Sequence, residues 1–140
     1  MQLIKSILKI AVVLSAGLLI GCHKQHSHQY LMQHPDVLGQ EYARCHSGVE
    51  KDEAYCDMIK RAQDDFISLV DIQQANQEKF GQQIIESEQQ LVVLQQALKK
   101  AQQDYSHDST QFKEARLQYE TQLEKVRVLL AVIKATGGMD

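Results

Sequence analysis

The sequence predicts an all-α protein, in which a short disulfide-tied helix is followed by a long helix that forms an antiparallel coiled-coil hairpin with a C-terminal helix. Three observations predict this fold class. The composition lacks tryptophan and contains one proline, and no segment shows the alternation of apolar and polar residues that marks a half-buried strand. Apolar residues recur instead at steps of three and four. A short polar turn divides the longest of these stretches in two.

The N-terminal segment has the organisation of an export signal. Lys5 and Lys9 precede an uncharged apolar run over residues 10–20, which is shorter than the roughly 20 residues that cross a bilayer but suits the core of a signal peptide. The run ends on Gly21 and Cys22. This ending resembles the bacterial lipobox, which implies cleavage between Gly21 and Cys22 and lipid attachment to the Cys22 thiol. The alternative interpretation is an uncleaved anchor helix with an incidental cysteine.

A lipid on Cys22 would attach the mature chain to a membrane, because two or three acyl chains anchor a protein stably. His23 follows the cysteine, at the position where Asp retains a lipoprotein in the inner membrane under enteric-type sorting. We therefore expect the outer membrane rather than the inner one, with the chain facing the periplasm. Residues 22–29 are polar and have no hydrophobic period, so we expect them to form a flexible tether.

Charge and motifs exclude other classes of function. Removing Lys5 and Lys9 from the 15 basic residues leaves 13 against all 18 acidic ones, a formal net charge of −5 for the mature chain. Nucleic-acid-binding proteins normally carry a clustered basic face, so we expect no nucleic-acid partner. The sequence also lacks a phosphate-binding loop, paired carboxylates in an enclosed setting and a Ser/His/Asp arrangement. We therefore expect a non-enzymatic protein without a cofactor.

The ends of a short helix over residues 35–46 are predicted by their residue types. Pro35 suits a first helical turn, Asp36 is favourable at the positive end of the helix dipole, and Gly48 supplies a left-handed C-cap. The expected inward residues of this helix are Val37, Leu38, Tyr42 and Cys45.

Cys45 and Cys56 form an even pair once Cys22 carries lipid. In an exported protein such a pair predicts a disulfide, which would tie the 35–46 helix to the next one. The alternative is a nucleophilic Cys45 beside His46. It is disfavoured because adjacent side chains on a helix do not face each other.

A long helix is predicted over about residues 49–105. Gly81 is expected to bend or loosen it. From residue 80 the apolar spacing alternates between four and three, which is the seam of a coiled coil. The seam residues are Phe80, Ile84, Ser87, Leu91, Leu94, Leu98, Ala101 and Tyr105, and the inward residues before them are Cys56, Ile59, Ala62, Phe66 and Val70.

Residues 106–110 predict a polar turn, in which Ser109 or Thr110 can cap the next helix. Two heptad-patterned helices with so short a turn predict an antiparallel hairpin. The apolar face of residues 50–75 is then expected to pack against the 35–46 helix. Exposed parts of the stripe can equally serve homo-oligomerisation. The heptad residues of the last helix are Phe112, Tyr119, Leu123, Val126, Leu130 and Ile133.

Residues 30–62 carry a further pattern: an aromatic residue, a His-Pro-acidic triplet, and two cysteines that bracket a glycine-containing loop. The residues are Tyr30, His34, Pro35, Asp36, Cys45, Gly48 and Cys56. With the lipobox, over about residues 19–62, the pattern resembles the entry-exclusion lipoproteins (EexN-type) found with conjugative type IV secretion systems. The chain departs from that family in having Ala54 and Tyr55 before the second cysteine, where the family usually has Pro and Asn, and in its long extension.

The resemblance implies an envelope lipoprotein that binds a component of a conjugation or type IV secretion apparatus and blocks redundant DNA transfer. The alternative function is a structural envelope lipoprotein, whose coiled coil oligomerises or spaces membrane from cell wall. We divide the chain into a signal peptide (1–21), a tether (22–29), a disulfide-linked helical module (30–62) and a coiled-coil hairpin (63–140).

The histidines raise the alternative of metal binding. A structural zinc site needs four ligands and a catalytic one needs three, but three of the histidines lie in the predicted tether without cysteine or carboxylate partners. We therefore expect no metal site and assign His34 to the start of the 35–46 helix. The histidines considered are His23, His26, His28, His34 and His46.

Overall fold

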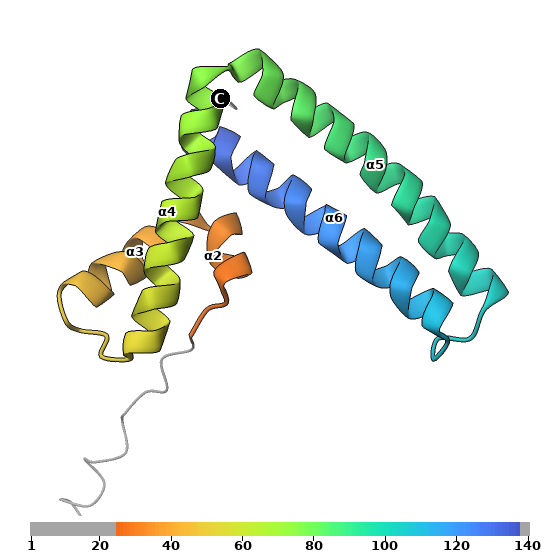
Figure 1. Cartoon of the computed structure of the whole chain (residues 1–140), viewed down its shortest axis with the longest axis horizontal. Helices are drawn as coiled ribbons and strands as arrows, with labels where there is room; N and C mark the ends of the chain where they lie inside the picture. Colours follow the sequence, from red (N-terminus) through yellow and green to blue (C-terminus); the bar gives the residue numbers. More distant parts are fainter. Residues whose placement is uncertain (1–24, 138–140) are drawn as a thin grey trace, which may run out of the picture.

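The structure, a computed structural model, describes residues 25–137, and this part of the chain contains no strand. Its helices are α2 (His28–Gln33), α3 (Pro35–His46), α4 (Glu53–Ala75), α5 (Gln77–Asp104) and α6 (Thr110–Ala135). The predicted all-α fold class is therefore confirmed. Figure 1 shows two arms that meet at the corner between α4 and α5: α4 with α2 and α3 packed against it, and the antiparallel pair α5 and α6.

Each helix begins at a residue that suits its first turn, where the backbone N–H groups have no acceptor inside the helix: either a capping side chain accepts one of them, or a proline lacks the N–H. At four starts a side-chain oxygen accepts a hydrogen bond from the backbone N–H three residues later, which satisfies a donor that has no partner inside the helix. The caps are Ser27, Asp52, Asn76 and Ser109. The remaining helix, α3, begins on Pro35 as predicted, with Asp36 in its first turn.

The single helix predicted over residues 49–105 is interrupted at Asn76, and in this respect the prediction is wrong. Asn76 ends α4 by donating its N–H to the Ile72 carbonyl at 3.3 Å, and its side chain starts α5 by accepting the Lys79 N–H at 2.8 Å. Its φ of −156° and ψ of 86° lie outside the helical region. Gly81, the expected site of a bend, lies within α5. The change of direction at Asn76 allows α6 to contact both α4 and α5.

The predicted disulfide is present and joins α3 to the first turn of α4. The Cα atoms of Cys45 and Cys56 are 5.6 Å apart. Gly48, in the connecting loop, has a φ of +71°, the left-handed conformation predicted for a C-cap glycine. The disulfide therefore closes a short hairpin of two helices.

The inward face of α3 differs from the prediction at one position. Leu38 is buried and Cys45 is half-buried, as expected, but Tyr42 is exposed and Glu41 takes the buried position instead. Burying a carboxylate is costly unless it is hydrogen-bonded. Here the Tyr55 hydroxyl, from α4, donates to the Glu41 carboxylate at 3.4 Å.

The main core lies where α2, α3, α4, the start of α5 and the end of α6 meet. Packing of α4 against α3 is confirmed, and α2 and α6 also contact α4. Because the core takes residues from both the disulfide-linked module and the hairpin, the two pack as one unit. The core residues are Leu31, Met32, Leu38, Tyr55, Ile59, Ala62, Phe66, Phe80, Leu129, Ala131 and Val132.

The predicted hairpin of α5 and α6 is confirmed, with a seam that is only partly closed. Ser87 and Ala101 are buried, whereas Leu91, Leu94 and Leu98 are half-buried, because two helices cover each other from one side only. The seam residues of α6 follow the same pattern, with Phe112 and Val126 buried and Tyr119, Leu123, Leu130 and Ile133 half-buried.

Two details of the hairpin add to the predicted pattern. Gln122 of α6 donates its side-chain N–H to the Ser87 carbonyl of α5 at 2.9 Å, which fixes the register of the two helices. Tyr105 was expected in the seam, but it follows the last residue of α5 and is 47% exposed.

The structure differs from the tether predicted over residues 22–29 in its second half. Gln25 donates its side-chain N–H to the Asp52 carboxylate at 2.9 Å, and the His26 backbone N–H donates to the Tyr55 hydroxyl at 3.2 Å. A helix then begins at His28. The predicted signal peptide (1–21), Cys22 and His23 lie outside the described residues. No helix among residues 25–137 combines the length and the apolar character needed to cross a membrane.

Candidate functional site

Three aromatic rings stack along one side of α2. The rings of His26 and Tyr30 have centroids 4.6 Å apart and an interplanar angle of 12°, and the rings of Tyr30 and His34 are 4.1 Å apart at 32°. Only Tyr30 lies within α2; His26 precedes its N-cap, Ser27, and His34 is its C-cap. Tyr30, the middle ring, is 39% exposed. The stack therefore presents an aromatic edge at the surface.

The junction between α2 and α3 fixes the last ring of this stack. His34 ends α2 by donating its N–H to the Leu31 carbonyl at 3.1 Å, and its carbonyl accepts the Leu38 N–H at 2.9 Å. Its φ of −129° is typical of a residue that precedes proline. The His34 side chain makes no capping hydrogen bond to α3. Its ring is thus held by stacking on Tyr30.

The same junction lines a groove against the C-terminal end of α6. Its larger part measures about 680 Å³, and a smaller part beside it about 370 Å³. One wall carries the Asp36 carboxylate and the other carries the Lys134 and Arg127 side chains, so opposite charges flank the groove. We call these residues together the α2–α3 surface: Tyr30, Gln33, His34, Pro35, Asp36, Arg127, Leu130, Ala131, Lys134 and Ala135.

The disulfide lies on a different part of the surface. The ring of Tyr42 lies parallel to that of His46, with centroids 6.3 Å apart, and both rings line a depression of about 330 Å³ above the two half-buried cysteines. The disulfide holds the end of α3 and thereby the orientation of the helix whose start forms the α2–α3 surface.

A series of polar contacts connects residues 25–27, which precede α2, to α3 and α4. The Tyr55 hydroxyl accepts from His26 N–H and donates to Glu41. Burial raises the pKa of Tyr55 above its ordinary value; the His26 N–H opposes this shift, and the negative charge of Glu41 adds to it. Hydrogen bonds from the Tyr55 backbone N–H and the Gln25 side chain lower the pKa of Asp52. These contacts position residues 25–27 beside α4.

The structure brings some of the predicted site residues together and separates others. Tyr30, His34, Pro35 and Asp36 share one surface, and the two paired cysteines are bonded. Among the histidines, His28 lies 2.9 Å from the Asp65 carboxylate on α4. Over the described range, no group of three or more His, Cys, Asp or Glu side chains is arranged to hold a metal ion.

Sequence reasoning missed the contribution of α6 to this surface. Arg127, Ala131 and Lys134 lie almost a hundred residues after the junction, and only the docking of α6 against α2 brings them there. The ring stack was missed as well. His26 was placed in the predicted tether and His34 was assigned to the start of the 35–46 helix, so the prediction did not bring these rings together with Tyr30.

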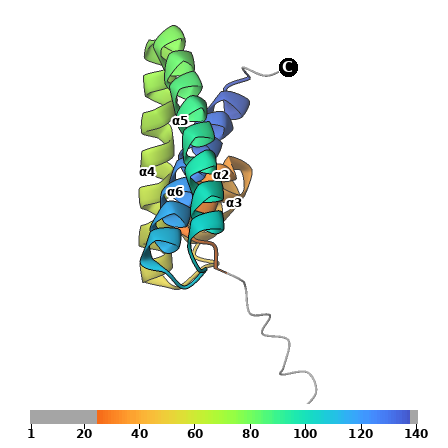
Figure 2. The same ribbon diagram turned by 90° about the vertical axis from the view of Figure 1, so that its right-hand side faces the viewer.

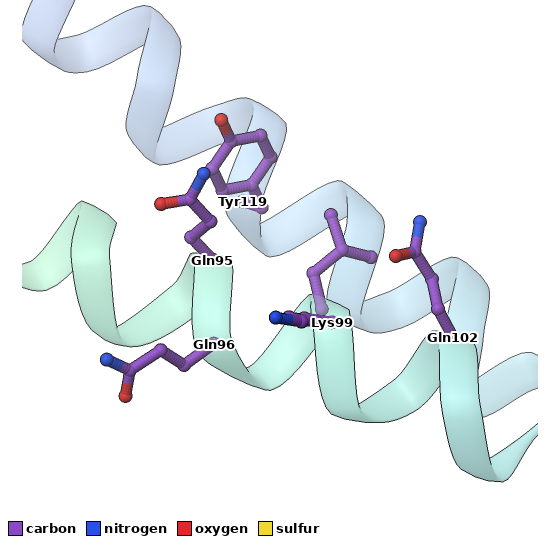
Figure 3. A pocket seen from close by; sticks show the side chains of 6 residues that line it. Gln95, Gln96, Lys99, Gln102 and Tyr119 are labelled. Atoms are coloured by element: carbon purple, nitrogen blue, oxygen red, sulfur yellow. The ribbon is translucent and has the colours of Figure 1, made fainter.

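The hairpin carries a separate depression. It measures about 610 Å³ and is lined mainly by glutamine and lysine side chains of α5, together with Tyr119 of α6. Figure 3 shows Gln95 beside the Tyr119 ring, with Lys99 and Gln102 further along α5. The half-buried Leu98 also lines it. This side of the seam is therefore open between the two helices.

Comparison of the chain with protein-family models, with curated proteins and with solved structures finds no match.

Proposed function

We propose that the chain is a lipid-anchored envelope lipoprotein that acts by binding rather than by catalysis, and that its α2–α3 surface engages a component of a conjugative or type IV secretion apparatus to exclude redundant DNA transfer. One observation carries the proposal. The four residues singled out by sequence resemblance, Tyr30, His34, Pro35 and Asp36, share one surface, and three of them line the groove against α6.

The chemistry of this surface suits recognition of a protein segment. Exposed aromatic rings supply much of the binding energy at protein interfaces, and Tyr30 stacks between two histidine rings. The lining of the groove combines the apolar Ala131 with the charged side chains of Asp36 and Lys134. Such mixed lining can bind an apolar side chain and orient its polar neighbours.

The surface is also held in place before any partner binds. Leu31, on α2, and Leu38, on α3, are fully buried in the core, and the disulfide closes the other end of α3. Closing a loop with a sequence separation of 11 stabilises a fold by about 3 kcal/mol in the chain-entropy estimate. A rigid surface loses less conformational entropy on binding.

Conjugation frequency tests the proposal directly. Recipients would express the wild-type chain, a Tyr30→Ala/Asp36→Ala variant, a Cys45→Ser/Cys56→Ser variant or no protein, with equal abundance and membrane attachment verified for each. We expect the wild type to reduce transfer and both variants to relieve the reduction. A Gln96→Ala variant, changed on the exposed face of α5, should behave as the wild type.

The opposite results would overturn the proposal. If the wild-type chain does not lower transfer from any matched donor system, exclusion is not its function. If transfer is lowered equally by the wild type and the Tyr30→Ala/Asp36→Ala variant, the α2–α3 surface is not the binding surface.

A second candidate function is structural, with the hairpin joining copies of the chain or spacing membrane from cell wall. The observation that favours it is the open seam, in which Leu91, Leu94 and Leu98 are only half-buried. A proline at Leu94 would break α5 and should impair this function, whereas removing the disulfide should spare it. The converse pattern supports the exclusion function.

A further inference from the structure

Two loops that are far apart in the sequence lie at the same end of the molecule. They are residues 47–52, between α3 and α4, and residues 105–109, between α5 and α6. Figure 1 and Figure 2, which share a vertical axis, both place these loops at the lower end, and both place the corner between α4 and α5 at the upper end. We call the two loops together the two-loop end.

The first described residues of the chain also lie at the two-loop end. The Gln25 side chain donates to Asp52, in the 47–52 loop, at 2.9 Å. Cys22 precedes Gln25 by three residues, which span at most about 10 Å when fully extended. A lipid on Cys22 would therefore be attached within about 10 Å of the Gln25 backbone, whose side chain contacts this loop.

We propose that the two-loop end rests on the surface of a lipid bilayer, with Val49 and Tyr105 in the headgroup region, so that the molecule stands on the membrane at two separated points. This inference depends on the lipid anchor in the proposed function. The corner at Asn76 then points away from the membrane.

The exposed side chains of the two loops fit such a surface. Val49 is 63% exposed and Tyr105 is 47% exposed, and they are two of the ten large apolar residues that are exposed in the described part of the chain. Tyrosine is enriched at membrane–water interfaces, because its ring is apolar and its hydroxyl is polar. Each loop thus carries one exposed apolar side chain at the same end of the molecule.

The charges of the two-loop end indicate how it is held there. The first loop and the start of α4 carry the acidic residues Glu50, Asp52 and Glu53 and the basic residue Lys51. Attraction to anionic lipid requires clusters of basic residues, so electrostatic attraction does not hold this end. Attachment comes from the lipid anchor, and the two loops set the orientation.

This orientation has a consequence for the α2–α3 surface. The C-terminal end of α6, which lines its groove, lies nearer to the corner than to the two-loop end (Figure 1). The groove is thus kept off the bilayer, where a partner in the periplasm can reach it.

Tryptophan fluorescence can test the orientation cleanly, because the chain contains no tryptophan. Single substitutions Val49→Trp and Tyr105→Trp place a probe in each loop. Ile72→Trp is the matched control, since Ile72 is 52% exposed but lies near the opposite end of α4. The full chain, made with its own signal, would be purified in detergent and reconstituted into phosphatidylcholine vesicles with or without brominated lipid.

We expect both loop probes to show blue-shifted emission and to lose intensity to brominated lipid, while Ile72→Trp keeps its intensity. Mass spectrometry on the same samples reports whether Cys22 is acylated. Acylated, vesicle-bound protein with unquenched loop probes, or with only one of the two quenched, would overturn the inference and leave the lipoprotein assignment intact. A chain without acylation would instead remove the lipid anchor from the proposed function, and the inference with it.

Discussion

At the scale of single residues, the contact between Tyr55 and Glu41 shows how a polar pair is accommodated in the core. Glu41 is 4% exposed, and the Tyr55 side chain is buried beside it. The Tyr55 hydroxyl also accepts the His26 N–H. A neutral Tyr55 can make both hydrogen bonds, whereas an ionised Tyr55 could not donate to Glu41 and would repel its carboxylate.

The pH dependence of stability should reveal this contact. Burial raises the pKa of Tyr55 in the folded state above its ordinary value of 10.0. A group with a raised folded pKa contributes stability that is fully present below its unfolded pKa and is lost as the pH rises through the folded one. We therefore expect the free energy of unfolding of the wild type, measured by urea denaturation, to decline above pH 10.

Two variants isolate the effect of Tyr55. Tyr55→Phe should be less stable than the wild type at pH 8, and the difference should shrink as the pH rises above 10. Tyr105→Phe, a change at an exposed position, should leave the decline as it is in the wild type. A constant difference between Tyr55→Phe and the wild type across this range would contradict the assignment.

The same residues show what could be predicted from sequence at this scale. Leu38 and Cys45 were placed on the inward face of α3 because apolar residues at helical spacing mark a core. Tyr42 was placed there for the same reason, and Glu41 was not considered. Hydrophobicity alone cannot identify a buried carboxylate, because its burial depends on a hydroxyl of α4 that the pattern of α3 does not contain.

At the scale of elements, the break at Asn76 determines the shape of the molecule. The sequence predicted one continuous helix here, with a bend or loosening at Gly81, since glycine has a low helix propensity. Asn76 carried the better signal, because asparagine is a preferred N-cap and Glu78 follows in the first turn of α5. The coiled-coil spacing from Phe80 to Ala101 was read correctly, since it reports local periodicity that the break does not disturb, whereas Tyr105 lies beyond the end of α5.

Removing the cap should measure how strongly this break is fixed. Asn76→Ala loses the hydrogen bond from the Lys79 N–H and should lower the free energy of unfolding by about 1 kcal/mol. Asn76→Ser retains a side-chain acceptor and should have a much smaller effect. Chemical denaturation of both variants provides the measurement. A stabilising Asn76→Ala substitution would show that helix propensity outweighs the cap at this position.

At the scale of the whole molecule, the end of α6 joins the two arms. The heptad pattern predicted Val126, Leu130 and Ile133 as the residues that face α5. It did not predict that Leu129 and Val132 would be buried as well, because they lie on an adjacent side of α6. That side belongs to the core shared with α2 and α4, a contact between segments that no local period can report.

Truncation of Leu129 tests whether the two arms unfold together. Leu129 is buried in the shared core, so Leu129→Ala should lower the free energy of unfolding by about 2–5 kcal/mol. Leu117, on the exposed part of α6, provides the control, and Leu117→Ala should change stability by less than about 0.5 kcal/mol. Urea denaturation would give both values.

Hydrogen exchange would locate the effect of the same substitution. If α6 supports α2 and α3 through the shared core, Leu129→Ala should speed amide exchange in α2 and α3 as well as at the end of α6, because local opening follows the loss of buried contacts. Leu117→Ala should leave exchange in α2 and α3 unchanged. Faster exchange confined to α5 and α6 in Leu129→Ala would contradict this, since it would show that the α2–α3 surface keeps its stability without the end of α6.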